Sequence, residues 1–179
     1  MMTMSGPVLV VAAHPDDETL GCGGTITRLR KEGWHVTIVL LTNGVSARWI
    51  ESTDRAAIAA RWYQCKSAAH ILGARVIAPG EFPDNECDSV SRLAMTRYIE
   101  KLIRHVRPAV VLTHSSSDLN IDHRRAHEAV LIATRPTPGQ CVRDVYAFEV
   151  PSSTEWGLHE FRPSLFVDIT ATLKRKLKA

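Results

Sequence analysis

Histidine and acidic residues gather in two short segments of this chain, and each segment follows an apolar run. The first is His14-Pro15-Asp16-Asp17-Glu18, which comes directly after the apolar run 8–13. His14 and Asp17 carry donor atoms that suit a borderline cation such as zinc, and Asp16 could act as a base. Carboxylates are also favoured at the start of a helix, where they meet free N–H groups. Capping alone would explain Glu18, but it does not explain a histidine at the end of a strand.

The second segment runs from His114 to His127 and follows the β-branched run 108–113. A catalytic zinc takes about three protein ligands and keeps one position open for water. His14, Asp17 and one histidine of the second segment would supply that number. The candidates for the third ligand are His114, His123 and His127, of which the last two are four residues apart and share a face if they lie on a helix.

Short β-branched runs alternate with longer helical stretches, and this order must bring the two segments together. The pattern predicts strands at 8–13, 36–42, 75–78, 108–113, 145–150 and 165–169. It predicts helices at 18–31, 54–72, 89–106 and 123–134. Ser89 is expected to be an N-cap, and Leu173–Lys178 a solvated last helical turn. Alternating strands and helices indicate right-handed crossovers and a mainly parallel sheet. The strands are apolar throughout, which is typical of a sheet covered on both faces. We therefore predict an α/β, three-layer, Rossmann-like fold, with ligands bound beyond the carboxyl ends of its strands.

Length and composition narrow the class of protein. The 179 residues suggest a single domain over 1–179, and the 45% hydrophobic and 23% charged content are ordinary for a globular protein. A net charge of +3 is too small to indicate a nucleic-acid partner. No stretch reaches the roughly 20 apolar residues that span a bilayer, and we see no secretory signal. The four cysteines form no metal or redox motif, so we expect free thiols in the cytoplasm.

Other residues that could carry chemistry have simpler explanations. Gly21, Gly23 and Gly24 lack the order of a phosphate-binding loop or of a dinucleotide-binding motif. We expect them to allow close packing of a helix. The remaining histidines show no partner pattern, and we expect them to be structural; they are His35, His70, His105 and His159.

The motif Ala13-His-Pro-Asp-Asp-Glu18, with the later Asp122-His123, resembles the PIG-L/LmbE-like family of de-N-acetylases. The resemblance extends from the first strand to Trp156. It implies an LmbE-like fold and one Zn²⁺ per chain, held by His14, Asp17 and His123. It also implies that Asp16 is the general base and that Arg61 contacts the substrate.

The chain departs from the family pattern in two ways. Many members have a histidine three residues before the last ligand, where this chain has Asn120. We expect Asn120 and Arg61 to line the substrate pocket. Members are also commonly longer, which leads us to expect that the chain lacks the family's C-terminal segment. The acid that protonates the leaving amine is then either Asp16, carrying the proton it has taken from water, or His114, the nearest candidate by position.

These observations predict a zinc-dependent N-deacetylase that acts on a small N-acetylated amino sugar or sugar conjugate. We expect neither a nucleic-acid nor a membrane partner, and leave a homo-oligomer open. Two alternatives remain: a zinc hydrolase of another amide or ester bond, and a non-catalytic Rossmann-like module that binds a sugar or nucleotide.

Overall fold

The computed structural model describes residues 6–47, 55–77, 80, 82–157 and 159–179. Five parallel strands form one sheet in the order β3-β2-β1-β4-β5. The strands are β1 (Pro7–Ala12), β2 (His35–Leu40), β3 (Arg75–Ile77), β4 (Val110–His114) and β5 (Asp144–Phe148). The helices are α1 (Asp17–Lys31), α2 (Arg55–Leu72), α3 (Arg92–Val106), α4 (Ile121–Ala133) and α5 (Leu173–Lys178), with short 3₁₀ turns at Cys87–Ser89 and Thr154–Trp156. The predicted α/β class with a parallel sheet is confirmed.

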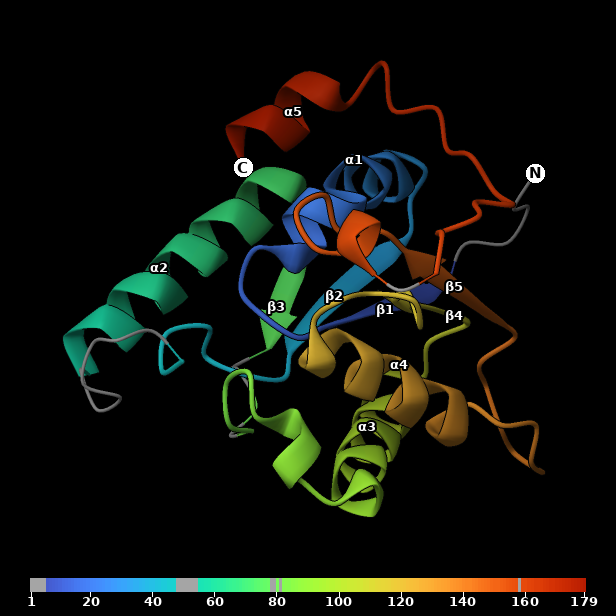
Figure 1. The fold of residues 1–179 in the computed structure, drawn as a ribbon. Coiled ribbons are helices and arrows are strands. Elements are labelled where there is room, and N and C mark those ends of the chain that lie inside the picture. The colour runs from blue at the N-terminus through green and yellow to red at the C-terminus, as the bar shows by residue number, and fades with distance from the viewer. Residues whose placement is uncertain (1–5, 48–54, 78–79, 81, 158) are drawn as a thin grey trace.

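Helices cover both faces of the sheet (Figure 1). Helices α1, α2 and α5 lie on one face, and α3 and α4 lie on the other. Along β1, Val8 and Val10 belong to the apolar core under α1 and α2, whereas Leu9 and Val11 belong to the core against α3 and α4. Successive side chains of a strand point to opposite faces. A strand buried on both faces therefore needs an unbroken apolar run, which is the pattern that the sequence has.

The parallel register places the functional segments at one edge of the sheet. β1 pairs with β2 from Pro7 opposite His35 to Ala12 opposite Leu40, and with β4 from Val8 opposite Val110. The chain segments that leave β1 and β4 therefore emerge side by side. The backbone N–H of Ala13 donates to Nε2 of His114 over 2.9 Å, which joins the two strand ends.

The predicted strand at 165–169 is wrong. These residues lie outside the sheet, in an irregular segment that crosses α1 on its way to α5 (Figure 1). Arg28 donates to the Asp168 carbonyl over 2.9 Å, and Thr172 donates to the Gly24 carbonyl over 3.0 Å. A short apolar run by itself does not establish a strand. The run is not buried either, because Leu165, Phe166 and Val167 are exposed.

The predicted N-cap at Ser89 is also wrong. Residues Cys87–Ser89 form a 3₁₀ turn, in which the Ser89 hydroxyl donates to the Glu86 carbonyl, and α3 begins after Ser91. The last helix agrees with the prediction, since α5 spans Leu173–Lys178. No helix among the described residues is both long and apolar enough to cross a bilayer.

The close packing expected of the α1 glycines is confirmed, and it gives a stability prediction. A Cβ on Gly24 would come within 2.7–2.9 Å of Ile169 atoms, whereas a Cβ on Gly23 would meet its nearest neighbours at 3.4–3.7 Å. Gly24→Ala is therefore expected to lower the free energy of unfolding by about 1–3 kcal/mol through overpacking. Gly23→Ala is the matched control, because alanine favours the helix and fits the space. Thermal or urea unfolding measures both. Equal stability of the two variants would contradict this account of the packing.

Candidate active site

The turn between β1 and α1 delivers the first functional residues. β1 ends at Ala12 and α1 begins at Asp17, so His14, Pro15 and Asp16 form a tight link. Asp16 has φ 152°, an uncommon value for a residue other than glycine. Such backbone strain is typical of functional sites. Glu18 reaches back to accept the Asp16 N–H over 3.1 Å, which supports the capping interpretation of this carboxylate.

Three donor atoms converge at the end of this turn. Nδ1 of His14 lies 3.2 Å from Oδ2 of Asp17 and 3.2 Å from Nε2 of His123. Nε2 of His123 lies 3.1 Å from the same Asp17 oxygen. Atoms that bind a tetrahedral zinc at about 2.1 Å are about 3.4 Å apart. The triangle of two imidazole nitrogens and one carboxylate oxygen therefore has the size and the donor chemistry of a zinc site.

Carboxylates hold the outer nitrogen of each of these histidines. Nε2 of His14 lies 3.1 Å from Asp122 and 3.3 Å from Asp84, and Nδ1 of His123 lies 3.0 Å from Asp118. Such partners fix the ring orientation and the tautomer of metal-binding histidines. The sequence suggests Asp122 as a residue that orients a ligand histidine, and the structure pairs Asp122 with His14.

The electrostatics of this cluster favour a cation. Burial lowers the pKa of His14, but its hydrogen bonds to Asp122, Asp17 and Asp84 outweigh that effect and raise the pKa to about 12. Burial raises the pKa of Asp17, but hydrogen bonds with His123 and His14 hold it well below its usual range. The carboxylates thus stabilise positive charge among the three donors, whether a proton or a divalent cation carries it.

Asp16 lies beside the donor triangle and outside it. Its Oδ2 accepts a hydrogen bond from Nη2 of Arg61 over 2.7 Å, and its side chain is 44% exposed. Burial and the neighbouring Asp17 raise its pKa, while Arg61 and His14 oppose the rise. A carboxylate that is accessible, oriented and more basic than usual can accept a proton from water.

The structure separates the three histidines of the second segment. His123, in the first turn of α4, is the one whose nitrogen joins His14 and Asp17. His127 lies one turn further on, and its Nδ1 is 2.8 Å from the His114 carbonyl oxygen. The i,i+4 spacing of His123 and His127 therefore does not reflect shared ligation.

His114 lies behind the triangle. Its ring is fully buried and stacks on His123 with 3.9 Å between ring centroids. Burial lowers its pKa to about 3, and its Nε2 already accepts the Ala13 N–H. This environment favours a supporting role for His114. Its predicted role as the acid has no support from this geometry.

A cavity of about 340 Å³ opens over the donor triangle. His14, Asp16, Asp17 and His123 form its floor, and its walls include Arg61, Asn85, Asn120, Ser152 and Ser153.

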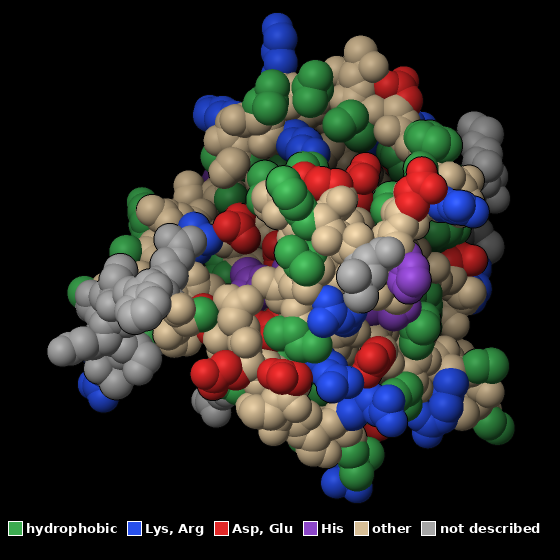
Figure 2. Space-filling model, viewed as in Figure 1, with side chains coloured by type: hydrophobic (Ala, Val, Ile, Leu, Met, Phe, Trp, Pro, Cys, Tyr) green, Lys and Arg blue, Asp and Glu red, His purple; other side chains and the backbone are tan. Residues whose placement is uncertain are grey.

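Asn120 is the N-cap of α4: its Oδ1 accepts the Asp122 N–H over 2.8 Å, and its Nδ2 donates to Asn85 over 2.9 Å. Figure 2 shows acidic and histidine side chains near one another on this face of the molecule. Arg61 and Asn120 both line the cavity, as they must if they contact substrate.

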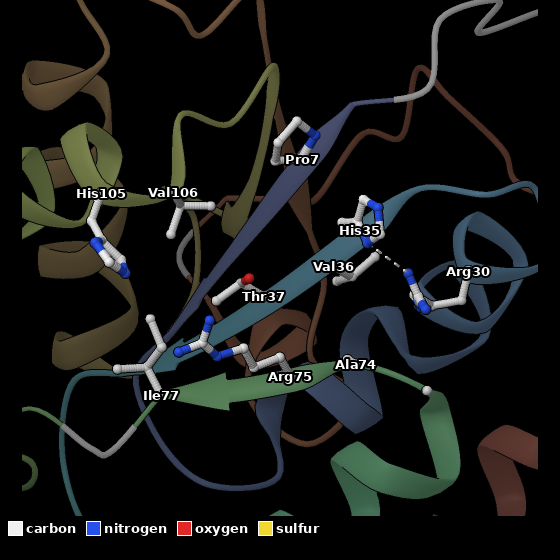
Figure 3. Close-up of a pocket in the computed structure, with 11 residues that line it drawn as sticks. Pro7, Arg30, His35, Val36, Thr37, Ala74, Arg75, Ile77, His105 and Val106 are labelled. Atoms are coloured by element: carbon white, nitrogen blue, oxygen red, sulfur yellow. Dashed lines mark hydrogen bonds between the residues drawn. The ribbon is translucent and has the colours of Figure 1, made fainter.

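A larger cavity, of about 550 Å³, lies at the opposite edge of the sheet (Figure 3). Its lining includes Arg30, His35, Arg75 and His105, and the described residues that line it include no carboxylate. Arg30 and His105 belong to the last turns of α1 and α3, where cations complement the helix dipole. None of the motifs singled out in the sequence lines this cavity.

Sequence reasoning did not single out Asp84, Asp118 or the turn at 150–154. Asp84 lies in a segment that reads only as a loop, and it accepts hydrogen bonds from Thr42 and from the Ala47 N–H. Asp118 is 35 and 36 residues away from its partners Ser153 and Thr154. A buried aspartate in a loop has no periodicity, so the sequence offered only its nearness to His123 as a signal.

The chain is similar to known proteins over most of its length. The model of the family "PIG-L: GlcNAc-PI de-N-acetylase" matches residues 9–134. The chain is 34% identical to the 4-oxalmesaconate hydratase of Pseudomonas putida over 200 residues, covering 100% of this chain and 73% of that protein. It is 32% identical to the diacetylchitobiose deacetylase of Thermococcus kodakarensis, covering 96% of this chain and 67% of that protein. The crystal structure of the 4-carboxy-2-hydroxymuconate hydratase of Pseudomonas putida superposes with a TM-score of 0.77 at 32% identity, covering 97% of this chain and 76% of that one.

Proposed function

Since this chain belongs to the PIG-L family of GlcNAc-PI de-N-acetylases, we propose that it is a zinc-dependent hydrolase that removes the N-acetyl group from an amino sugar or sugar conjugate. The observation that carries the proposal is the donor triangle of His14, Asp17 and His123, with the Asp16 carboxylate beside it and outside it, held by Arg61. The family includes deacetylases of N-acetylated sugars, such as the Thermococcus relative. The cytoplasmic location stays a prediction, and a homo-oligomer stays open.

His14, Asp17 and His123 would hold the cation at the floor of the cavity. Zn²⁺ bound there would lower the pKa of water toward about 7 and polarise a carbonyl group. Asp122 and Asp118 pair with the outer nitrogens of His14 and His123, which leaves the inner nitrogens to hold the cation.

Asp16 is the proposed general base. It accepts the proton from water as water attacks the acetyl carbon, while Arg61 holds the carboxylate in place. The same carboxyl group then donates that proton to the departing amine. We favour this shuttle over proton donation by His114, because His114 is buried and does not line the cavity.

Arg61 and Asn120 are proposed to contact the substrate from the walls of the cavity. The planar guanidinium can bind a hydroxyl or phosphate group with the N–H groups that Asp16 leaves free. The cavity of about 340 Å³ is at the lower end of the range for small-molecule sites, which suits one sugar unit.

The deciding experiment is acetate release by the metal-loaded chain from a panel of N-acetylated amino sugars and their conjugates. Acetate from at least one sugar, abolished by a chelator, is the expected result. Turnover of simple esters alone would favour the alternative hydrolase. Binding of a sugar or nucleotide with no turnover in either panel would favour the non-catalytic module.

A hydratase is the second candidate, because the Pseudomonas putida hydratase matches the whole chain at 34% identity. In that reaction the same base and cation would activate water to add across a carbon–carbon double bond. An unsaturated carboxylate belongs in the panel for this reason. Loss of its ultraviolet absorbance without acetate release would select the hydratase.

A further inference from the structure

Asp118 connects parts of the site that are distant in the sequence. Its side chain is 1% exposed and lies in the loop between β4 and α4. Oδ2 lies 3.0 Å from Nδ1 of His123 and accepts hydrogen bonds from Thr154 over 2.6 Å and from Ser153 over 3.0 Å. Oδ1 accepts the Asn120 N–H over 2.9 Å. One carboxylate thus binds a candidate metal ligand, the start of α4 and the turn after β5.

The turn at 150–154 forms one wall of the cavity, since Val150, Ser152 and Ser153 line it. Ser152 has φ 110°, a backbone conformation that is strained for serine. The Thr154 hydroxyl accepts the Val150 N–H over 2.7 Å and donates to Asp118, which closes the turn onto the carboxylate. Ser153 also accepts the Leu119 N–H at its carbonyl over 3.3 Å. These contacts hold the strained turn against the loop that carries Asp118.

We propose that Asp118 is a positioning residue that couples the metal ligand His123 to the substrate-facing turn at 150–154. This inference rests on the proposed function, because it assigns the cation to His123 and the substrate to the cavity. By accepting the Nδ1 proton of His123, Asp118 leaves the lone pair of Nε2 directed at the donor triangle. By accepting hydrogen bonds from Thr154 and Ser153, Asp118 fixes the position of the turn at 150–154 relative to the donor triangle.

The coupling predicts different outcomes for two variants. Asp118→Asn removes the charge from both connections, so we expect metal affinity to fall about 10- to 100-fold, as for other outer partners of metal ligands, and KM to rise. Ser153→Ala removes one donor from the wall and a longer contact, 3.4 Å, between the Ser153 hydroxyl and Nδ1 of His123, but it leaves the Asp118 carboxylate 3.0 Å from that nitrogen. We expect it to raise KM about 3- to 10-fold while metal affinity stays within about 2-fold, which are order-of-magnitude figures for one lost hydrogen bond.

The test starts from the metal-free chain. Zinc affinity is measured by chelator competition, and the geometry of the ligands by the visible absorption of the cobalt(II)-loaded chain. KM and kcat are measured on the sugar that the panel selects. Asp144→Asn, an exposed aspartate at the start of β5, is the matched control and should match the wild type in every readout. Circular dichroism of the metal-free variants checks that each is folded.

Unchanged zinc affinity and an unchanged cobalt spectrum in Asp118→Asn would overturn the inference. So would an unchanged KM in Ser153→Ala, which remains a test if Asp118→Asn does not fold. Failure of the proposed function would look different. The wild type would release no acetate, but Asp118→Asn would still weaken zinc binding. In that case the link from Asp118 to the metal site stands, and only the proposed reaction is wrong.

Discussion

Asp16→Asn is expected to retain the metal and to lose most of the turnover. General base catalysis contributes about 10²–10⁴-fold to rate, and an amide cannot accept the proton of water, so we expect kcat to fall at least about 100-fold. The substitution is otherwise mild. Asparagine tolerates positive φ better than most residues, and its oxygen can still accept the hydrogen bond from Arg61. Metal content by mass spectrometry and kcat on the selected sugar are measured together.

The comparison of these two readouts decides the role of Asp16. Asp144→Asn again serves as the control for loss of a carboxylate far from the cavity. If Asp16→Asn lost metal in proportion to activity, Asp16 would be a metal ligand. We do not expect this result, because Asp16 pairs with Arg61 outside the donor triangle. If kcat were unchanged, another group would be the base.

Asp17→Asn is expected to abolish stable metal binding. Oδ2 of Asp17 is the only anionic corner of the proposed triangle, and it also accepts the His14 N–H over 2.8 Å. Losing a direct ligand should weaken affinity by more than the roughly 100-fold upper range for an outer partner. Zinc at a thousand times its dissociation constant should stabilise the wild type by about 4 kcal/mol. The variant should show little of this stabilisation, and activity should fall with it.

Asp84→Asn is the informative companion to Asp17→Asn. A second group of donors, His14 with Asp84 and Asp122, also lies within reach of a single cation. If the metal bound there, Asp84→Asn would cause the larger loss of affinity and Asp17→Asn the smaller one. We expect the reverse order, because the triangle of His14, Asp17 and His123 combines two imidazole nitrogens with a carboxylate and all three of its residues line the cavity. Thermal shift and chelator competition on both variants distinguish the two arrangements.

The sequence alone determined the α/β class, the helices and the five strands of the sheet, apart from shifts of a few residues at their ends. Apolar runs and helical periodicity are local properties of the sequence. A parallel sheet that is buried on both faces needs continuous apolar strands, so its strands are easy to recognise. The AHPDDE motif placed His14, Asp16 and Asp17 at the end of the first strand, since the residues that leave a strand stay together whatever the rest of the chain does.

Only the tertiary structure decided which partners meet at this site. Residue types and spacing alone allowed His114, His123 or His127 to be the third metal ligand. The pairing of β1 with β4 buries His114 against the Ala13 N–H, and the start of α4 turns His123 toward Asp17. Asp84 meets Thr42, and Asp118 meets Ser153 and Thr154, across more than 30 residues of sequence. The run 165–169 lies across α1, outside the sheet. Such contacts depend on how separate elements pack, which local sequence patterns do not encode.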